Sequence, residues 1–482
     1  MAAVKSGSAA KALFWKLAER FGVQTVQLFF QLWLARLLEP AHYGALAMMM
    51  VFVSLGNTLV RNGLHPALIQ KKNADIRDFS AALWASLAAA VIFCLPLFCA
   101  APQFAALCGM KQSAPAFRAL LLSVFPYAAQ SVLLALAGRR LHFRPVFFSG
   151  MTAAVLAGTA ALLLAGNGFG LWALVVQNLL YTAVSCALLW ILLRFKPVLS
   201  CDLRRLRTLL AFGWKLIVAG LLDTAYQSLY SLVIGRKYSA EQLGFYSRGR
   251  QLPQVLAVGA GDGLHSILLP VLSAGQSDHA AVKRGVRRAV SLSAYLIFPL
   301  MALLAGAAEP LLSFLLTEKW LPAAPFLRIF CLSFALYPVS VCHLQAINAI
   351  GRSDVFLKLE LVKKAVGTIA LLAAVLCFDR PVSLALAGAA VSLLGCAVNG
   401  WAVRRLLGYT YSEQLFDLLP TTGLAILVYS TVRLLGAVQL PLLGVLLLQG
   451  IVGVSLYLGL SALLRVEPFI YLIKLWRERK AK

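Results

Sequence analysis

Acidic residues are scarce in this sequence: its 482 residues include only 18 Asp and Glu, against 44 Lys and Arg. Charged residues of both signs make up 13% of the chain, whereas 61% of it is hydrophobic. This composition leaves too little polar surface to cover a water-soluble globule of this length. We therefore expect most side chains to face lipid.

The sequence also lacks the short motifs that mark common catalytic and metal sites. It contains no P-loop, no H-E-x-x-H, no G-x-S-x-G and no Rossmann glycine pattern, which argues against ATP-driven transport within this chain. The nine cysteines form no C-x-x-C pair, and the adjacent Cys342 and His343 offer two metal ligands without a third. We expect no enzymatic activity, no cofactor and no bound metal.

Long apolar runs take the place of the missing polar surface. A bilayer core needs about 20 apolar residues per helix, and about 14 segments of this kind follow one another along the chain. The first is expected at residues 13–38, the second at 43–61 and the eleventh at 355–378. The sequence therefore predicts an all-α polytopic membrane protein with about 14 transmembrane helices.

Lys and Arg gather in alternate connections between these segments, as the positive-inside rule requires of cytoplasmic loops. The basic connections include Lys71, Arg139-Arg140, Arg204-Arg205, Lys283-Arg284 and Arg404-Arg405. This distribution predicts that both termini are cytoplasmic, and it accounts for the net charge of +26 without a nucleic-acid partner. One turn departs from the pattern, because Arg236, Lys237, Arg248 and Arg250 flank a connection that the rule places outside.

The chain looks duplicated. At an offset of 200 residues, Asn62-Gly63-Leu64-His65 aligns with Asp262-Gly263-Leu264-His265, and Gly44 aligns with Gly244. A second correspondence pairs Phe117–Ser123 with Leu327–Ser333, and Tyr127 with Tyr337. Equivalent segments are six spans apart, an even number, so both copies cross the membrane in the same direction. We expect two six-helix lobes, at residues 1–200 and 201–410, followed by two extra helices and a basic tail at 411–482.

Charges inside apolar segments are the strongest candidates for function, because a charge at mid-membrane costs about 3 kcal/mol or more unless it faces a cavity or a partner. The interior carboxylates are Glu19, Asp223 and Asp262, which we interpret as members of ion pairs in a cavity or as ligands of a coupling H⁺ or Na⁺. Arg36 and Arg61 are expected near helix ends, where their side chains can reach headgroups. No soluble domain is expected between the segments.

Interior or near-interior arginines outnumber these carboxylates. Arg118 and Arg328 occupy matched positions of the two copies, so a central axis would bring them to the same depth on opposite walls. The excess of positive charge favours an anionic substrate such as a phosphate or pyrophosphate, which Arg can hold with two hydrogen bonds. The predicted substrate-binding residues are Arg20, Arg118, Arg248, Arg250 and Arg328.

Several stretches resemble a known family. These stretches are Ala35–Gly44, Gly63–Gln70, Leu243–Gln254, Leu269–Ser273 and Glu318–Pro325. They are similar to bacterial polysaccharide flippases of the multidrug/oligosaccharidyl-lipid/polysaccharide exporter superfamily, in the branch that contains colanic-acid and teichuronic-acid exporters. The resemblance covers the whole chain.

The resemblance implies a transporter of the bacterial inner membrane that flips a polyprenyl-pyrophosphate-linked oligosaccharide to the outer leaflet by alternating access. The cargo would serve lipopolysaccharide O-antigen, capsule or exopolysaccharide synthesis, and the cavity would lie between the two lobes. Membrane lipids and a polysaccharide polymerase are the implied partners. A multidrug/cation antiporter of the same superfamily stays open as an alternative, although the scarcity of interior carboxylates disfavours it. A membrane glycan polymerase or ligase stays open as well, although the short loops disfavour it.

Overall fold

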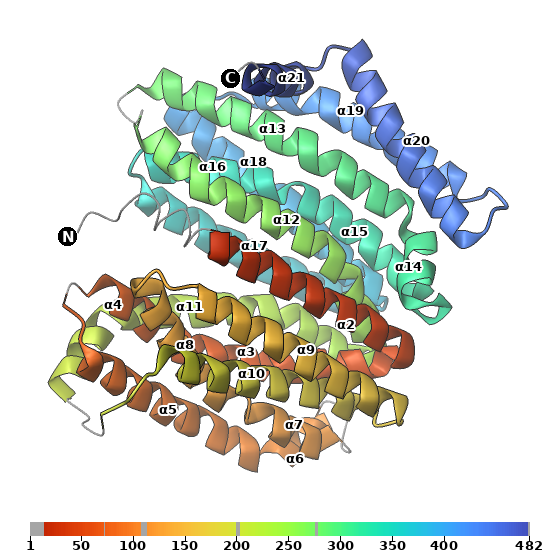
Figure 1. Ribbon diagram of the computed structural model, residues 1–482. Coiled ribbons are helices and arrows are strands. Elements are labelled where there is room, and N and C mark those ends of the chain that lie inside the picture. The colour runs from red at the N-terminus through yellow and green to blue at the C-terminus, as the bar shows by residue number, and fades with distance from the viewer. Residues whose placement is uncertain (1–13, 72, 108–112, 199–202, 275–277, 481–482) are drawn as a thin grey trace. The chain divides into compact units, whose positions relative to one another are not determined.

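Two compact units make up the chain, a first unit from Met1 to Gly244 and a second unit from Phe245 to Lys482 (Figure 1). The computed structural model describes residues 14–71, 73–107, 113–198, 203–274 and 278–480. Within these ranges the chain is helical with short connections and contains no strand, which confirms the predicted all-α class. The expected division into lobes at residues 1–200 and 201–410, with 411–482 apart, stays a prediction.

Helices of the first unit follow one another with few intervening residues. They are η1 (Glu19–Val23, a π-helix), α2 (Gln24–Leu37), α3 (Pro40–Arg61), α4 (Leu64–Gln70), α5 (Ile76–Cys99), α6 (Ala101–Leu107), α7 (Ala114–Leu121), α8 (Val124–Arg139), α9 (Arg144–Gly166), α10 (Leu171–Leu193) and α11 (Leu203–Lys237). Helix α12 (Ala240–Ala274) begins in this unit and continues into the second.

The second unit has the same character. Its further helices are α13 (His279–Gly306), α14 (Ala308–Leu316), η3 (Glu318–Ala323, a 3-10 helix), α15 (Ala324–Ala335), α16 (Tyr337–Ala349), α17 (Ser353–Cys377), α18 (Pro381–Leu407), α19 (Tyr411–Leu435), α20 (Leu442–Leu463) and α21 (Glu467–Lys480). Helix α19 packs closely along α13, and α20 packs on α19.

Twelve helical segments of the described ranges are long and apolar enough to cross a membrane. The two other expected spans, 13–38 and 355–378, are helical as well, as η1 with α2 and as α17. Charged residues interrupt both of them, since Glu19 and Arg20 lie in η1, and Glu360, Lys363 and Lys364 lie in α17. The structure therefore confirms a many-span helical membrane protein.

Each unit buries small and aliphatic side chains between its helices and presents large apolar side chains outward. Ile92, Leu376 and Leu463 are 74%, 84% and 76% exposed. In water such exposure would cost free energy, but in a bilayer the hydrocarbon chains cover these side chains. The apolar outer surface is thus a second observation that favours lipid as the solvent of both units.

Glycines allow helix α3 to approach two other helices closely. Along α11, which runs antiparallel to α3, a Cβ added to Gly235 would lie 1.9 Å from Cε of Met48 on α3. At the first turn of α12, a Cβ on Gly44 would lie 1.5 Å from the carbonyl oxygen of Ala240, and one on Gly244 would lie 2.1 Å from that of Pro40. The two glycines that the sequence repeat aligned therefore make a reciprocal contact, because each packs against the backbone of the residue four positions before the other.

Ion pairs tie together the ends of the helices at which the basic residues gather. In the first unit, Asp78 is fully buried and lies 2.7 Å from Lys71 Nζ and 3.4 Å from Arg205 Nη1. Arg205 also lies 2.6 Å from Asp75. Partial desolvation acts to raise the pKa of Asp75, but the hydrogen bond and charge of Arg205 outweigh it and leave that pKa below its usual value. Some of the loop cations thus have protein carboxylates as partners.

Candidate functional site

A polar seam runs along the contact between α3 and α11 in the first unit. The hydroxyl groups of Thr58 and Thr224 are 2.9 Å apart. Next to Thr224, the half-buried Asp223 accepts a hydrogen bond of 2.8 Å from Gln227 one turn later. Threonine hydroxyls in membrane helices commonly form such hydrogen bonds with a neighbouring helix. The carboxylate of Asp223 therefore lies among polar groups inside a candidate span.

Arg61 lies next to this seam, and its position differs from the expected one. The second span was predicted to end at residue 61, but only Asn62 and Gly63 separate α3 from α4, and the apolar segment continues from Pro40 to Gln70. Arg61 is therefore an exposed cation inside a 31-residue candidate span. Its Nη1 donates a hydrogen bond of 3.1 Å to the hydroxyl of Tyr127 on α8. Arg61 thus has a neutral protein partner, whereas the sequence predicted contact with a lipid headgroup.

The two units differ at this position. The repeat aligns Arg61 with Gly261 and Tyr127 with Tyr337. In the second unit the same two positions are again in contact, since a Cβ on Gly261 would lie 2.5 Å from the ring of Tyr337. The contact is thus kept in both units, whereas the cation occurs only in the first. The self-alignment already contained this signal, because it pairs a charged residue of one copy, Arg61, with an uncharged residue of the other, Gly261.

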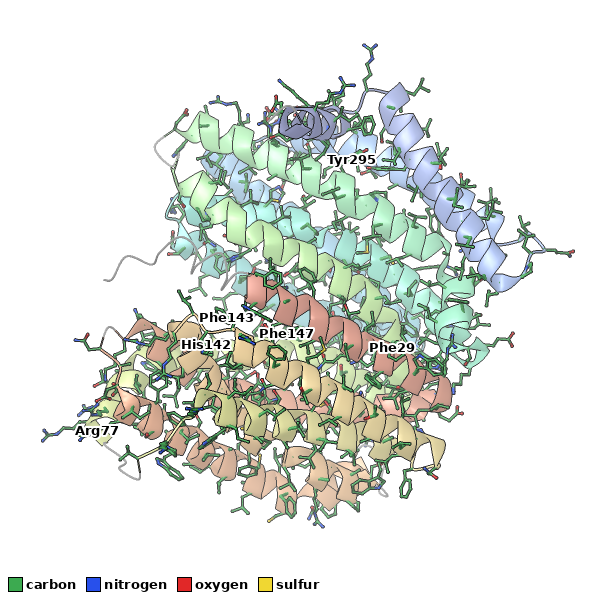
Figure 2. All side chains as sticks on the ribbon, in the orientation of Figure 1. Phe29, Arg77, His142, Phe143, Phe147 and Tyr295 are labelled. Carbon is green, nitrogen blue, oxygen red and sulfur yellow. The ribbon has the colours of Figure 1, made fainter. Side chains whose placement is uncertain are left out.

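Glu19 and Arg20 lie in the π-helical turn η1 at the start of the first segment. Glu19 Oε2 lies 3.3 Å from Lys16 Nζ on the same helix face, so the carboxylate has a local partner. Trp15 anchors this segment on α9, with its ring centroid 5.5 Å from that of Phe147. Figure 2 shows Phe147 on the part of α9 that lies beside this segment, and Phe143 just before α9 begins. A π-helical turn often marks a functional site in a helix.

Arg118 and Arg328 have equivalent partners in the two units. Arg118 Nε donates to the carbonyl of Phe98, the penultimate residue of α5, at 3.1 Å. Arg328 Nε donates to the carbonyl of Ala305, the penultimate residue of α13, at 3.4 Å, and its Nη2 lies 2.8 Å from Glu309. Both arginines thus hold the C-terminal end of an earlier span. Substrate binding by these two residues stays a prediction.

Replacing either arginine with alanine should lower stability, because the last carbonyls of a helix then lose a charged donor. We expect Arg118→Ala and Arg328→Ala each to lower the free energy of unfolding by about 1 kcal/mol. Unfolding of the purified protein in detergent measures this effect. A double variant that unfolds like the native protein but fails to export would instead assign both side chains to the substrate.

The remaining predicted residues lie on α12. Arg248 Nη1 donates to Gln251 Oε1 on the next turn. The guanidinium of Arg250 lies 6.0 Å from the ring centroid of Phe334, and its buried Nε has no hydrogen-bond partner in the described part of the chain. Asp262 falls on α12 as well, but its side chain is outside the part that the structure describes. Arg250 is therefore a second interior cation with an uncharged neighbour.

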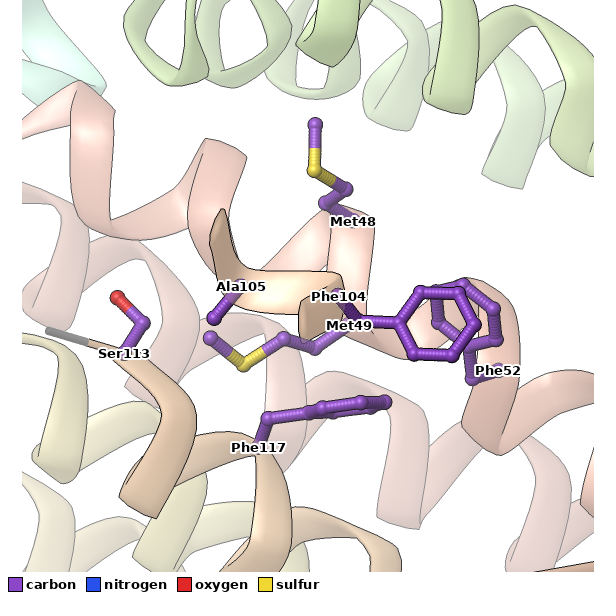
Figure 3. A pocket seen from close by; sticks show the side chains of 7 residues that line it. All are labelled: Met48, Met49, Phe52, Phe104, Ala105, Ser113 and Phe117. Carbon is purple, nitrogen blue, oxygen red and sulfur yellow. The ribbon is translucent and has the colours of Figure 1, made fainter. Parts of the chain in front are cut away.

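A small apolar pocket lies between α3, α6 and α7. Figure 3 shows Met49, Phe52, Phe104 and Phe117 around it, and its volume is about 20 Å³. This volume is close to that of one water molecule, so the pocket is a packing defect of the first unit and does not match the size of a substrate.

Solved structures of membrane transporters share this fold. The structure described as "Lipid II flippase MurJ, inward closed conformation" matches 94% of this chain and 98% of its own, with a TM-score of 0.74 and 12% identity. An inward-facing multidrug resistance MATE family transporter of the MOP superfamily matches 80% of this chain and 96% of its own, with a TM-score of 0.60 and 16% identity. The fold is therefore that of a polytopic helical membrane protein.

The family follows from the sequence. Residues 33–325 match the family described as "Polysaccharide biosynthesis protein", and the chain belongs to this family. The succinoglycan biosynthesis transport protein ExoT of Rhizobium meliloti is 24% identical over 70% of this chain and 68% of its own length. The lipopolysaccharide biosynthesis protein WzxC of Escherichia coli is 23% identical over 68% of both chains. The resemblance to polysaccharide exporters is thereby confirmed.

Proposed function

We propose that this protein flips a polyprenyl-pyrophosphate-linked oligosaccharide from the inner to the outer leaflet of a bacterial cytoplasmic membrane, as a transporter and not as an enzyme. The observation that carries the proposal is the presence of cations inside candidate spans with uncharged neighbours. Within the described residues, neither Arg61 nor Arg250 forms an ion pair; Arg61 contacts a tyrosine hydroxyl and Arg250 a phenylalanine ring.

An unneutralised guanidinium in an apolar segment costs free energy, and its retention implies a ligand that compensates for it. A pyrophosphate offers several oxygen acceptors, and charge-assisted hydrogen bonds from Arg to phosphate are among the strongest in proteins. The fold shared with a lipid II flippase and the family of polysaccharide biosynthesis proteins support the same class of cargo. We assign the phosphate contacts to Arg61 together with Arg20, Arg248 and Arg250.

Three finer assignments belong to the same proposal. Asp223, with Gln227 as its hydrogen-bond partner, binds a coupling H⁺ or Na⁺. Both termini face the cytoplasm, since Lys and Arg gather at alternate connections; labelling from outside of a cysteine introduced at residue 439 checks this orientation. The product is passed to a polysaccharide polymerase for capsule, O-antigen or exopolysaccharide synthesis.

Flipping can be measured with the purified chain in liposomes that contain a polyprenyl-pyrophosphate-linked oligosaccharide. We expect the fraction of glycan that becomes accessible to an added lectin to rise faster with the protein than in empty liposomes. A membrane-impermeant pyrophosphatase gives a second reading, because it cleaves only the exposed headgroups.

Equal accessibility in empty and protein-containing liposomes would contradict the proposal. An ion-gradient-driven uptake of organic cations by the same liposomes would instead favour the multidrug antiporter, whose fold is also similar. A release of longer glycans would indicate a polymerase.

A further inference from the structure

A basic groove lies at the end of the second unit, outside the candidate site. It is lined by Arg284, Arg287, Arg288, Ser291 and Leu292 of α13, by Asp417 of α19, and by Glu467, Pro468 and Tyr471 of α21. Its volume is about 300 Å³, which is enough for a group the size of a phosphoglycerol. Three helices that are distant in the sequence contribute to it.

The three arginines of the groove differ in how far their charge is already neutralised. Arg287 donates two hydrogen bonds to Asp417, from Nε at 2.8 Å and from Nη2 at 2.7 Å, and it also lies 3.4 Å from Glu413. Its charge is therefore satisfied inside the protein. Tyr409 supports the arrangement by donating its hydroxyl to Asp417 at 2.6 Å. Arg287 thus forms the wall of the groove and does not contribute a free donor.

Arg284 and Arg288 keep most of their donors available. Arg284 is 72% exposed and lies 3.8 Å from the exposed Asp278, a distance at the limit of an ion pair. Arg288 lies 4.8 Å from the ring centroid of Tyr471, and it forms no ion pair with the described residues. Glu467 also lines the groove without such a pair. A cation held over an aromatic ring is oriented but not neutralised, so these two guanidinium groups remain able to bind an anion.

The position of α21 indicates that this anion is part of a lipid. Figure 1 shows α21 nearly along its axis, whereas α13 and α20 of the same unit run across the view. Helix α21 therefore runs crosswise to α13 and α20, as interfacial amphipathic helices do relative to spanning helices. Its residues Phe469 and Leu472 pack on a buried cluster that includes Tyr295, which Figure 2 shows on α13.

We propose that the groove between α13 and α21 binds the phosphate of an anionic phospholipid. Arg284 and Arg288 donate to the phosphate oxygens, and Ser291 lies one helical turn deeper with a further hydroxyl. Leu292 and Pro468 give the groove an apolar wall for the glycerol backbone and the first carbons of the acyl chains. Basic pockets between membrane helices at the headgroup level bind anionic lipids in this way.

Lipid retention by the full-length protein in native mass spectrometry tests the proposal. The probes are phosphatidylglycerol, phosphatidylcholine and inorganic phosphate. We expect Arg284→Gln with Arg288→Gln to weaken phosphatidylglycerol retention by roughly tenfold to thirtyfold, from the loss of two cations at the headgroup level. Arg284→Lys with Arg288→Lys should keep part of the retention, which separates charge from misfolding.

A matched control is available at the end of α18. Arg404 and Arg405 are exposed and also lie over aromatic rings, those of Tyr411 and Trp401, so Arg404→Gln with Arg405→Gln removes the same charge outside the groove. Retention close to that of the native protein in this control supports the groove. An equal loss in the control would indicate general adsorption to the basic surface and overturn the proposal. Full displacement of the lipid by millimolar phosphate would overturn its lipid part.

Discussion

Replacing Arg61 with glutamine should reduce flipping by about tenfold or more, because the loss of one charge-assisted hydrogen bond to a phosphate has a free-energy effect of that order. The protein should remain folded, since Arg61 donates one hydrogen bond of 3.1 Å to the hydroxyl of Tyr127 and forms no ion pair in the described ranges. The removal of an uncompensated cation from an apolar segment is not expected to lower stability. Lectin accessibility in liposomes measures the rate.

Two controls separate the charge of Arg61 from its surroundings. Tyr127→Phe removes the hydroxyl but keeps the cation, and we expect flipping within about threefold of the native rate because one neutral hydrogen bond has a small net effect. Arg36→Gln removes the same charge from an exposed side chain that lies over Trp33 near the end of α2, and it should be nearly silent. A folded Arg61→Gln protein that flips at the native rate would remove Arg61 from the site.

The architecture could be predicted from the sequence because the signals for it are local. The length of an apolar run sets where a helix crosses the membrane, and the alternation of basic connections predicts its direction. The repeat could also be predicted, down to the pairing of Gly44 with Gly244 and of Tyr127 with Tyr337. In the structure, Gly44 lies against Ala240 and Gly244 against Pro40, and each aligned tyrosine contacts the equivalent position 61 or 261.

The partners of interior charges could not be predicted, because they depend on how helices pack. Nothing in the sequence near Arg118 or Arg328 shows that each donates to the penultimate carbonyl of an earlier span. Asn62-Gly63 resembles the end of a helix, and only the structure shows that the apolar segment continues to Gln70 and leaves Arg61 inside it. The proposed site therefore rests on two observations. The sequence shows an excess of arginine, and helix packing defines where these arginines lie.

Replacing Gly44 or Gly244 with alanine should destabilise the protein strongly. The added Cβ would lie 1.5 Å from the carbonyl oxygen of Ala240 in the first case and 2.1 Å from that of Pro40 in the second. Both opposing atoms belong to backbones, so no side-chain rotation relieves the overlap, and the starts of α3 and α12 must move apart. Overpacking of this kind costs about 1–3 kcal/mol or more. Thermal unfolding in detergent should show a clear decrease in the midpoint for each variant.

The reciprocal geometry also predicts how the two substitutions combine. Once Gly44→Ala has separated the two helix starts, much of the space that Gly244→Ala needs already exists, so the double variant should lose less stability than the sum of the single losses. Gly259→Ala is the matched control on α12, because a Cβ there would have no neighbour within 4 Å, and it should be neutral or stabilising. Strictly additive losses, or an unchanged midpoint for Gly44→Ala, would show that α3 and α12 do not meet through these glycines. Sub-additive losses, the expected result, would show that the aligned positions Gly44 and Gly244 take part in one shared helix contact.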